Sequence, residues 1–111
     1  MGKVLIIIKS RLGEGSQAAE GLRLAAAMLG MDMLPTIIFL DRGVDLLLPG
    51  GVEGDLLDYL KAISSLAGVK ALKESLGPQG EKALNQELEV EVIDMERLID
   101  LILECESVIA L

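Results

Sequence analysis

Three small residues early in the chain have the spacing of a nucleotide-binding turn. Gly13, Gly15 and Ala18 follow an apolar run and form the pattern G-x-G-x-x-A, which is a permitted form of the dinucleotide-binding fingerprint. Asp41 ends the next apolar run, where an acidic residue would hold a ribose hydroxyl. The pattern raises the possibility of a small-anion or nucleotide site in the loop from Gly13 to Ser16.

Other details of this loop argue against a dinucleotide. In the fingerprint the first glycine follows the strand almost directly, whereas Ser10, Arg11 and Leu12 intervene here. Glu14 lies inside the loop, and its negative charge opposes a phosphate. No G-K-[ST] sequence follows, which excludes a P-loop. The simpler interpretation is a tight strand-to-helix turn in which the glycines permit the backbone geometry and Ser16 caps the helix.

The remaining side chains supply few catalytic groups. The chain has no histidine, so Ser-His pairs, Cys-His pairs and histidine-based metal sites are excluded. Glu87, Glu89 and Glu91 fall on one face of an alternating segment. We interpret them as a solvated face or a charged sheet edge rather than a site for a hard metal ion. We therefore expect neither a metal nor a cofactor.

Cys105 is the single cysteine of the chain, which excludes an internal disulfide. It shares a predicted helical face with Leu98 and Ile102, and a free cysteine among apolar neighbours usually behaves as a small hydrophobe. Glu104 and Glu106 flank it, and their charges would raise the pKa of the thiol. A structural role is favoured, with a role as persulfide acceptor as the alternative.

Composition and charge limit the class of protein and its partners. The length of 111 residues fits a single domain, residues 1–111, and a hydrophobic content of 51% indicates a globular fold. The net charge of −8 and the near absence of aromatic residues argue against a nucleic-acid partner. No apolar run approaches the roughly 20 residues of a membrane span. We expect a cytoplasmic protein, and its mean hydropathy of +0.50 favours an oligomer.

Strand-like and helix-like segments alternate along the chain. Short apolar or alternating runs predict strands over residues 3–9, 33–41, 69–75, 87–93 and 107–111. Apolar residues at helical spacing predict helices over residues 16–30, 55–68 and 94–105. Residues that favour helix ends flank them: Ser16, Asp55 and Asp94 as caps, and Gly30 and Gly68 as stops. This order predicts an α/β protein with a mostly parallel sheet and helices on both faces.

Loops at one edge of this sheet form the predicted site. The carboxyl ends of parallel strands meet at one edge, where ligands bind in open α/β sheets. The loops after the first two strands bring the following residues there: Ser10, Arg11, Gly13, Gly15, Ser16, Asp41, Arg42 and Gly43. We interpret them as a cleft for a ligand or a partner subunit. Lys73 and Glu74 reach the same edge and are interpreted as solvated surface.

Three stretches of the chain resemble the DsrE/DsrF-like family of small sulfur-relay proteins. They are "VLIIIKS", "GSQAAEGLRLAAAML" and "IIFLDRGVDLLLPG". The family pattern hydrophobic-Asp-Gly-Val appears here as Leu40-Asp41-Arg42-Gly43-Val44, with Arg42 as an extra residue. The closing "CESVIAL" is similar to the final helix and strand of the family. The resemblance covers essentially the whole chain.

The resemblance implies a three-layer α/β/α sandwich with a five-stranded, largely parallel sheet. It also implies assembly into dimers, trimers or hexamers of identical or related subunits. The active branch carries a persulfide-forming cysteine at the end of the third strand, at or near Leu72 here, where no cysteine is present. The chain thus resembles the DsrF-type branch. We expect a non-catalytic, oligomer-forming subunit of a sulfur-relay or related system, homomeric or mixed, that contacts a sulfur-carrier protein.

Overall fold

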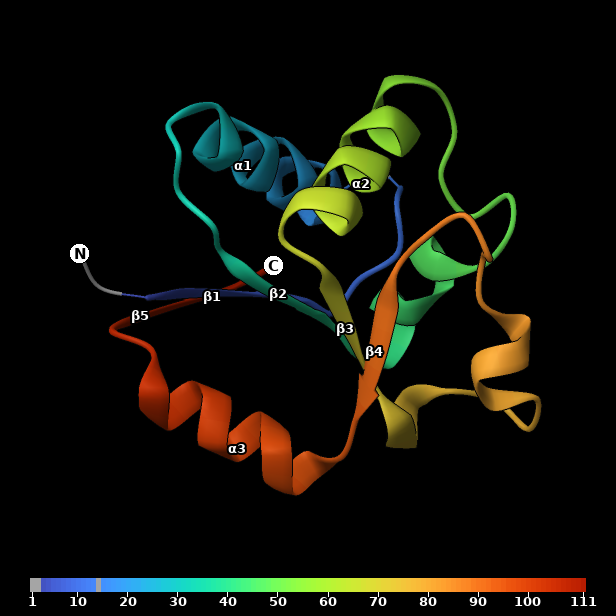
Figure 1. The fold of residues 1–111 in the computed structure, drawn as a ribbon. Coiled ribbons are helices and arrows are strands. Elements are labelled where there is room, and N and C mark those ends of the chain that lie inside the picture. The colour runs from blue at the N-terminus through green and yellow to red at the C-terminus, as the bar shows by residue number, and fades with distance from the viewer. Residues whose placement is uncertain (1–2, 14) are drawn as a thin grey trace.

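The computed structural model describes residues 3–13 and 15–111, and its centre is a five-stranded sheet (Figure 1). Its strands are β1 (Val4–Ile8), β2 (Thr36–Phe39), β3 (Val69–Leu72), β4 (Val90–Ile93) and β5 (Ser107–Ala110). They lie in the order β4-β3-β2-β1-β5, and every neighbouring pair is parallel. The expected parallel sheet is confirmed.

Helices cover both faces of the sheet. The helices α1 (Ala18–Gly30) and α2 (Gly54–Leu66) lie on one face, and α3 (Met95–Glu104) lies alone on the other (Figure 1). This confirms the three-layer α/β/α architecture. Three short 3-10 helices complete the fold: η1 (Asp41–Leu47), η2 (Lys73–Ser75) and η3 (Gly80–Ala83). Within the described residues, every helix is too short or too polar to span a bilayer.

The apolar core is divided by the sheet into two layers. Successive residues of a strand point to opposite faces, so Ile37 packs towards α1 and α2 while Ile38 packs towards α3. The layer under α3 is the smaller one and contains Leu5, Ile38, Leu72, Ile93, Leu98 and Leu101. Because both faces of the central strands β1 and β2 are buried, β1 and residues 37–39 of β2 are continuously apolar rather than alternating.

All five strands are shorter than the sequence pattern predicts, and β2, expected over residues 33–41, spans only Thr36–Phe39. The segment 69–75 leaves the sheet after Leu72, where η2 begins, and the segment 87–93 joins the sheet only at Val90. The strand β4 is an edge strand that pairs only with β3, residue for residue from Val69 to Leu72. Beyond those four residue pairs, the carbonyl of Glu89 accepts the N–H of Val69 at 3.4 Å, and the regular pairing ends there. The prediction that this is an outer strand is confirmed.

The acidic residues around β4 do not line up on one strand face. Only Glu91 belongs to β4, and its carboxylate pairs with Lys70 at 2.6 Å. The Lys70 ammonium, through this hydrogen bond and its charge, lowers the pKa of Glu91. Glu87 precedes the strand and pairs with Lys61 of α2 at 2.8 Å. These contacts attach the edge of the sheet to its neighbours.

Two side-chain carboxylates bind the first N–H groups of α3, and one of them, Asp94, was predicted. Asp94 is the N-cap residue, and its carboxylate accepts the N–H of Arg97 at 2.8 Å. Glu74 adds a bond that the sequence did not suggest, since its carboxylate accepts the N–H of Met95 at 3.0 Å. Two of the otherwise unpaired N–H groups at this helix start are therefore satisfied.

The predicted cap of α2 is wrong. The helix begins at Gly54, and Glu53 occupies the N-cap position without a side-chain hydrogen bond. Asp55 instead lies in the first turn, where its charge is favourable next to the positive end of the helix dipole. Gly54, the first residue of α2, has a φ of +64°, a left-handed conformation that glycine adopts without steric cost.

Different residue types adopt the left-handed conformation after α1 and after α2. Gly68 follows α2 with a φ of +77°, and its N–H bonds to the carbonyls of Ile63 and Ser64 at 3.1 Å, which confirms the predicted glycine stop. Gly30 is the last residue of α1, but the left-handed residue there is Asp32, with a φ of +59°. Aspartate tolerates this conformation better than most residues.

Ser64 joins α2 to the start of β4 through a buried hydroxyl. The hydroxyl accepts the N–H of Glu89 and donates to the carbonyl of the same residue at 3.3 Å. Ser64→Ala is expected to lower the free energy of unfolding by about 1 kcal/mol, because two part-buried hydrogen bonds to Glu89 are lost. Urea denaturation measures this loss. The exposed neighbour Ser65 is the matched control, and a comparable loss in Ser65→Ala would contradict this explanation.

Candidate functional site

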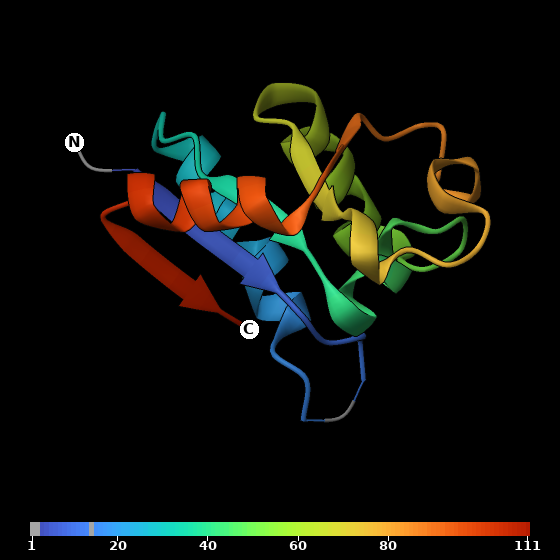
Figure 2. The ribbon, with the colours of Figure 1, turned by 90° about the horizontal axis from the view of Figure 1, so that it is seen from below.

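The candidate site lies at the carboxyl edge of the sheet. The chain leaves β1 towards α1 on one face, whereas α3 brings it back to β5 on the other face. The strands β1 and β5 therefore form the topological switch point, the usual ligand position in open α/β sheets. Figure 2 shows the loop after β1 beside η1 at this edge.

Hydrogen bonds within the loop after β1 hold its two serines together. The hydroxyl oxygens of Ser10 and Ser16 lie 3.1 Å apart. The Ser16 hydroxyl also accepts the N–H of Ala18, the first residue of α1, at 3.1 Å. The helix thus begins two residues later than predicted. Gly15 has a φ of +78°, which glycine adopts without steric cost.

The hydrogen bonds within this loop leave fewer N–H groups free to bind an anion. The N–H of Ala18 is already occupied by Ser16, so it is not free to bind a phosphate oxygen. Gly13 is exposed, and its carbonyl accepts the N–H of Ser16 at 3.0 Å in a turn. Glu14, whose charge we expected to oppose a phosphate, lies outside the described residues. The observed bonds are those of a turn stabilised by its own side chains.

Arg11 crosses from the β1 loop to η1. Its Nε lies 2.7 Å from Oδ2 of Asp45, and both side chains are partly exposed. The sequence did not single out Asp45, because nothing local connects it with Arg11. An anion that bound Arg11 would have to displace this carboxylate. Arg42, the other predicted cation of the cleft, is exposed on η1.

Asp41 connects the ends of β2 and β3. Its backbone has a φ of +50°, in the left-handed region, and its N–H donates to the hydroxyl of Ser75 at 2.8 Å. The Asp41 side chain is exposed. Ser75 is a second residue that the sequence did not single out, because it falls in the segment predicted as the end of a strand. The bond joins η1 to η2.

Gly43 allows η1 to pass over the end of β1. It is buried, and a Cβ atom on it would lie 2.0 Å from the carbonyl oxygen of Ile8 and 3.2 Å from the backbone nitrogen of Lys9. No side chain fits in that space. Gly43 therefore brings the loops after β1 and β2 together by close backbone contact rather than by lining an open cleft.

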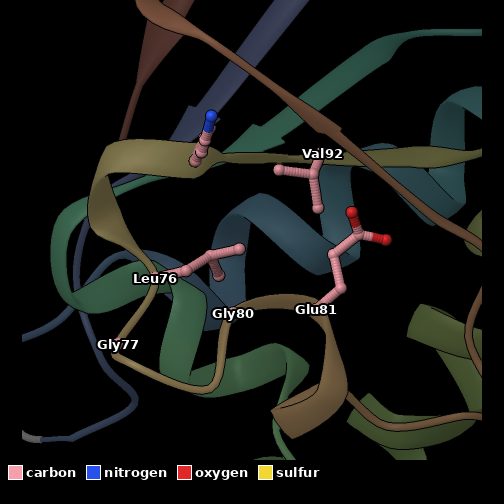
Figure 3. A pocket seen from close by; sticks show the side chains of 6 residues that line it. Leu76, Gly77, Gly80, Glu81 and Val92 are labelled. Carbon is pink, nitrogen blue, oxygen red and sulfur yellow. The ribbon is translucent and has the colours of Figure 1, made fainter.

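Two hollows lie beside the predicted cleft, around the segment 76–80. The first has a volume of about 460 Å³ and is lined by Lys73, Leu76, Gly77, Gly80, Glu81 and Val92. Figure 3 shows the side chains of Leu76, Glu81 and Val92 directed into it. The second, of about 500 Å³, shares Leu76, Gly77 and Gly80 and reaches Asp45 and Ser75. The two contacts Arg11–Asp45 and Asp41–Ser75 border the second hollow.

The side chains around these hollows favour binding over covalent chemistry. They include one ammonium group, from Lys73, two carboxylates, from Glu81 and Asp45, and the hydroxyl of Ser75. The hydroxyl of Ser75 accepts the N–H of Asp41, and the chain has no histidine to act as its base. Sequence reasoning missed the segment 76–80, although its Gly-Pro and Gly residues marked a turn.

Leu72 lies at or near the position where the resemblance implies a transfer cysteine. It is the last residue of β3, and its side chain is 4% exposed within the layer under α3. It packs there with Ile38, Ile93 and Leu98 among others. A buried leucine at this point provides apolar contacts and no nucleophile.

Cys105 directly follows α3 and packs, half-buried, against the same layer. Burial raises the pKa of the thiol, and the charge of Glu104 raises it further, while Lys3 opposes both effects. The sequence predicted the direction of this pKa shift but attributed it to the flanking glutamates alone. Burial, which only the tertiary structure reveals, is the larger cause.

The raised pKa makes the native thiol slow to react. At pH 8 iodoacetamide is expected to alkylate Cys105 more slowly in the folded chain than in the urea-unfolded chain, because burial disfavours the thiolate. The pH midpoint of the alkylation rate is expected above that of the unfolded thiol. Mass spectrometry of samples quenched at successive times measures the alkylation rate in each state and its dependence on pH. Equal rates in the two states, or a midpoint shifted downwards, would contradict this prediction.

Comparison with known proteins identifies the fold. The chain superposes on the crystal structure of the YchN protein of E. coli with a TM-score of 0.76 and 22% identity, over 100% of both chains. The chain has the DsrE/DsrF-like fold. This confirms the fold that the resemblance implied. No family model and no curated protein matches the chain.

Proposed function

We propose that the chain is a non-catalytic, oligomer-forming subunit of a sulfur-relay or related sulfur-trafficking system, of the DsrF-type, acting through protein contacts. The observation that carries the proposal is the burial of Leu72, at or near the position that the resemblance matches to the transfer cysteine. The fold shared with YchN supports the comparison that defines this position. A subunit with this fold and without the nucleophile contributes surface rather than chemistry.

The state of the single cysteine supports the same proposal. A sulfur acceptor needs an accessible thiolate, which positive neighbouring charge favours. Cys105 is half-buried and its pKa is raised by burial and by Glu104. In this proposal, therefore, a partner protein carries the sulfur and this chain does not. The alternative, in which Cys105 carries a persulfide, requires the opposite electrostatic environment.

Exposed apolar side chains support the expectation of a partner subunit. Within residues 3–13 and 15–111, ten large apolar side chains are exposed. Five of the ten lie on α3 and β5: Met95, Ile99, Ile102, Leu103 and Val108. Apolar side chains concentrated on one face are typical of a protein–protein interface.

Intact-mass spectrometry with a persulfide donor tests the proposed function. The native wild type is expected to gain no sulfur, while the urea-unfolded chain gains a sulfur adduct that is missing in Cys105→Ala. This control shows that the donor is active. An adduct on the native wild type that disappears in Cys105→Ala would replace the proposal with the persulfide-carrier alternative. Light scattering on the same sample measures the subunit number, and a monomer without any protein partner would also contradict the proposal.

A further inference from the structure

One side of α3 presents an apolar stripe that no part of residues 3–13 and 15–111 covers. Leu98 and Leu101 face the sheet and are buried. Met95, Ile99 and Leu103 follow one another at spacings of four residues and therefore form a second stripe beside the buried one. They are 45%, 50% and 78% exposed. The helix is thus apolar over more of its circumference than the sheet can bury.

The apolar surface continues onto the edge strand β5. Val108 pairs with Leu5, which belongs to the layer under α3, so Val108 points to the same face of the sheet. It is 44% exposed. Figure 2 shows that the α3 ribbon crosses the amino-terminal part of β1 and does not overlie β5. We call the surface formed by Met95, Ile99, Ile102, Leu103 and Val108 the α3–β5 face.

The charges beside the α3–β5 face are mainly negative. Residues 94–106 contain five acidic residues and one basic residue, Arg97. Arg97 faces away from the stripe and pairs with Glu104 at 3.4 Å. Glu96 and Asp100 each follow a residue of the stripe and are exposed, and among the described residues neither forms an ion pair. They form an acidic border along the stripe.

We infer that the α3–β5 face docks a partner protein through a basic amphipathic segment. The apolar side of that segment covers the stripe, and its Lys or Arg residues face Glu96 and Asp100. A second copy of this chain fits less well, because a twofold interface would place the same acidic borders together. The inference rests on the proposed function, in which the chain acts through protein contacts, and it specifies the chemistry of the partner.

A synthetic amphipathic peptide tests this docking surface. The probe contains only Leu and Lys, in about 18 residues, enough to form a helix on binding, and the control peptide has Glu in place of every Lys. NMR titration of the 15N-labelled chain is expected to shift the amides of α3 and β5 with the Leu/Lys peptide only. The dissociation constant is expected to increase by about tenfold or more between low and high salt, because the charges are exposed.

Matched variants distinguish peptide binding at the α3–β5 face from nonspecific attraction of the peptide to the overall negative charge. Glu96→Lys with Asp100→Lys is expected to weaken binding by about tenfold or more. Asp55→Lys with Asp58→Lys makes the same change of charge on α2 and is expected to have little effect. Leu103→Ser, on the α3–β5 face, and Leu66→Ser, on α2, form the corresponding test and control for apolar contacts, since both leucines are exposed. Circular dichroism checks that all variants are folded.

Three results would overturn the inference: equal weakening by both charge variants, equal binding of the two peptides, or a self-association that Leu103→Ser abolishes. The last result would assign the face to a second copy of the chain. None of them changes the persulfide experiment, because that reports on Cys105 alone. Conversely, sulfur on the native cysteine would refute the proposed function and leave the peptide result standing, so the two failures are distinguishable.

Discussion

Gly43→Ala is expected to lower the free energy of unfolding by about 3 kcal/mol or more, because the new methyl group has no space. Its carbon would lie 2.0 Å from the carbonyl oxygen of Ile8. That oxygen also accepts the N–H of Leu40 at 3.0 Å, so it cannot move away without breaking the link between the ends of β1 and β2. A loss of this size lowers the melting temperature by about 10 °C or more in a domain of this length.

The measurement is thermal and urea denaturation of Gly43→Ala beside Gly30→Ala. Gly30 is in α1, and a Cβ atom there meets no atom within 4 Å. Alanine favours helix over glycine by about 1 kcal/mol, so Gly30→Ala is expected to be neutral or stabilising. If Gly43→Ala is as stable as wild type, the close approach of η1 to β1 is not a requirement of the fold.

Leu72→Ala is expected to lower the free energy of unfolding by about 2–5 kcal/mol, which is the range for removing a buried leucine side chain. Leu72 lies between β3 and α3 with 4% of its surface exposed. Its loss leaves a cavity that Ile38, Ile93 and Leu98 border. Urea denaturation measures the change.

Leu103→Ala is the matched control, because the same atoms are removed from a side chain that is 78% exposed. Its free energy of unfolding is expected to stay within about 0.5 kcal/mol of wild type. A stable Leu72→Ala variant would mean that the end of β3 is open to solvent. The functional argument would then weaken, since an open position at this point would accept a cysteine or a ligand.

Local patterns were sufficient to predict the order of the elements. The unbroken apolar run of β1 and the helical periodicity around Leu98 and Leu101 reflect which faces are buried, and these patterns are properties of neighbouring residues. Asp94 caps α3 as predicted. A helix cap is a local feature, because its two partners, here the Asp94 carboxylate and the Arg97 N–H, are only three positions apart in the sequence. Element ends were less predictable: the partner strand limits β3 and β4, and a partner strand is not a local property.

In the candidate site too, local features were predictable from the sequence and non-local contacts were not. The sequence placed Ser10, Ser16 and Asp41 at the carboxyl edge of the sheet, because strand order alone brings these loops there. It did not show that Arg11 pairs with Asp45, or that the segment 76–80 separates two hollows. Those arrangements depend on how the loops after different strands pack together.

The sequence by itself determined the alternation of strands and helices, the absence of a cysteine near Leu72 and the lack of histidine, because these are features of composition and of short-range order. Only the tertiary structure decided which groups meet. The N–H of Asp41 reaches Ser75, 34 residues away, and Ser64 reaches Glu89, 25 residues away. Among the residues that the structure describes, packing also leaves the Met95, Ile99 and Leu103 side of α3 exposed. Contacts of this kind have no local signal, because they arise only when separate elements close on a common core.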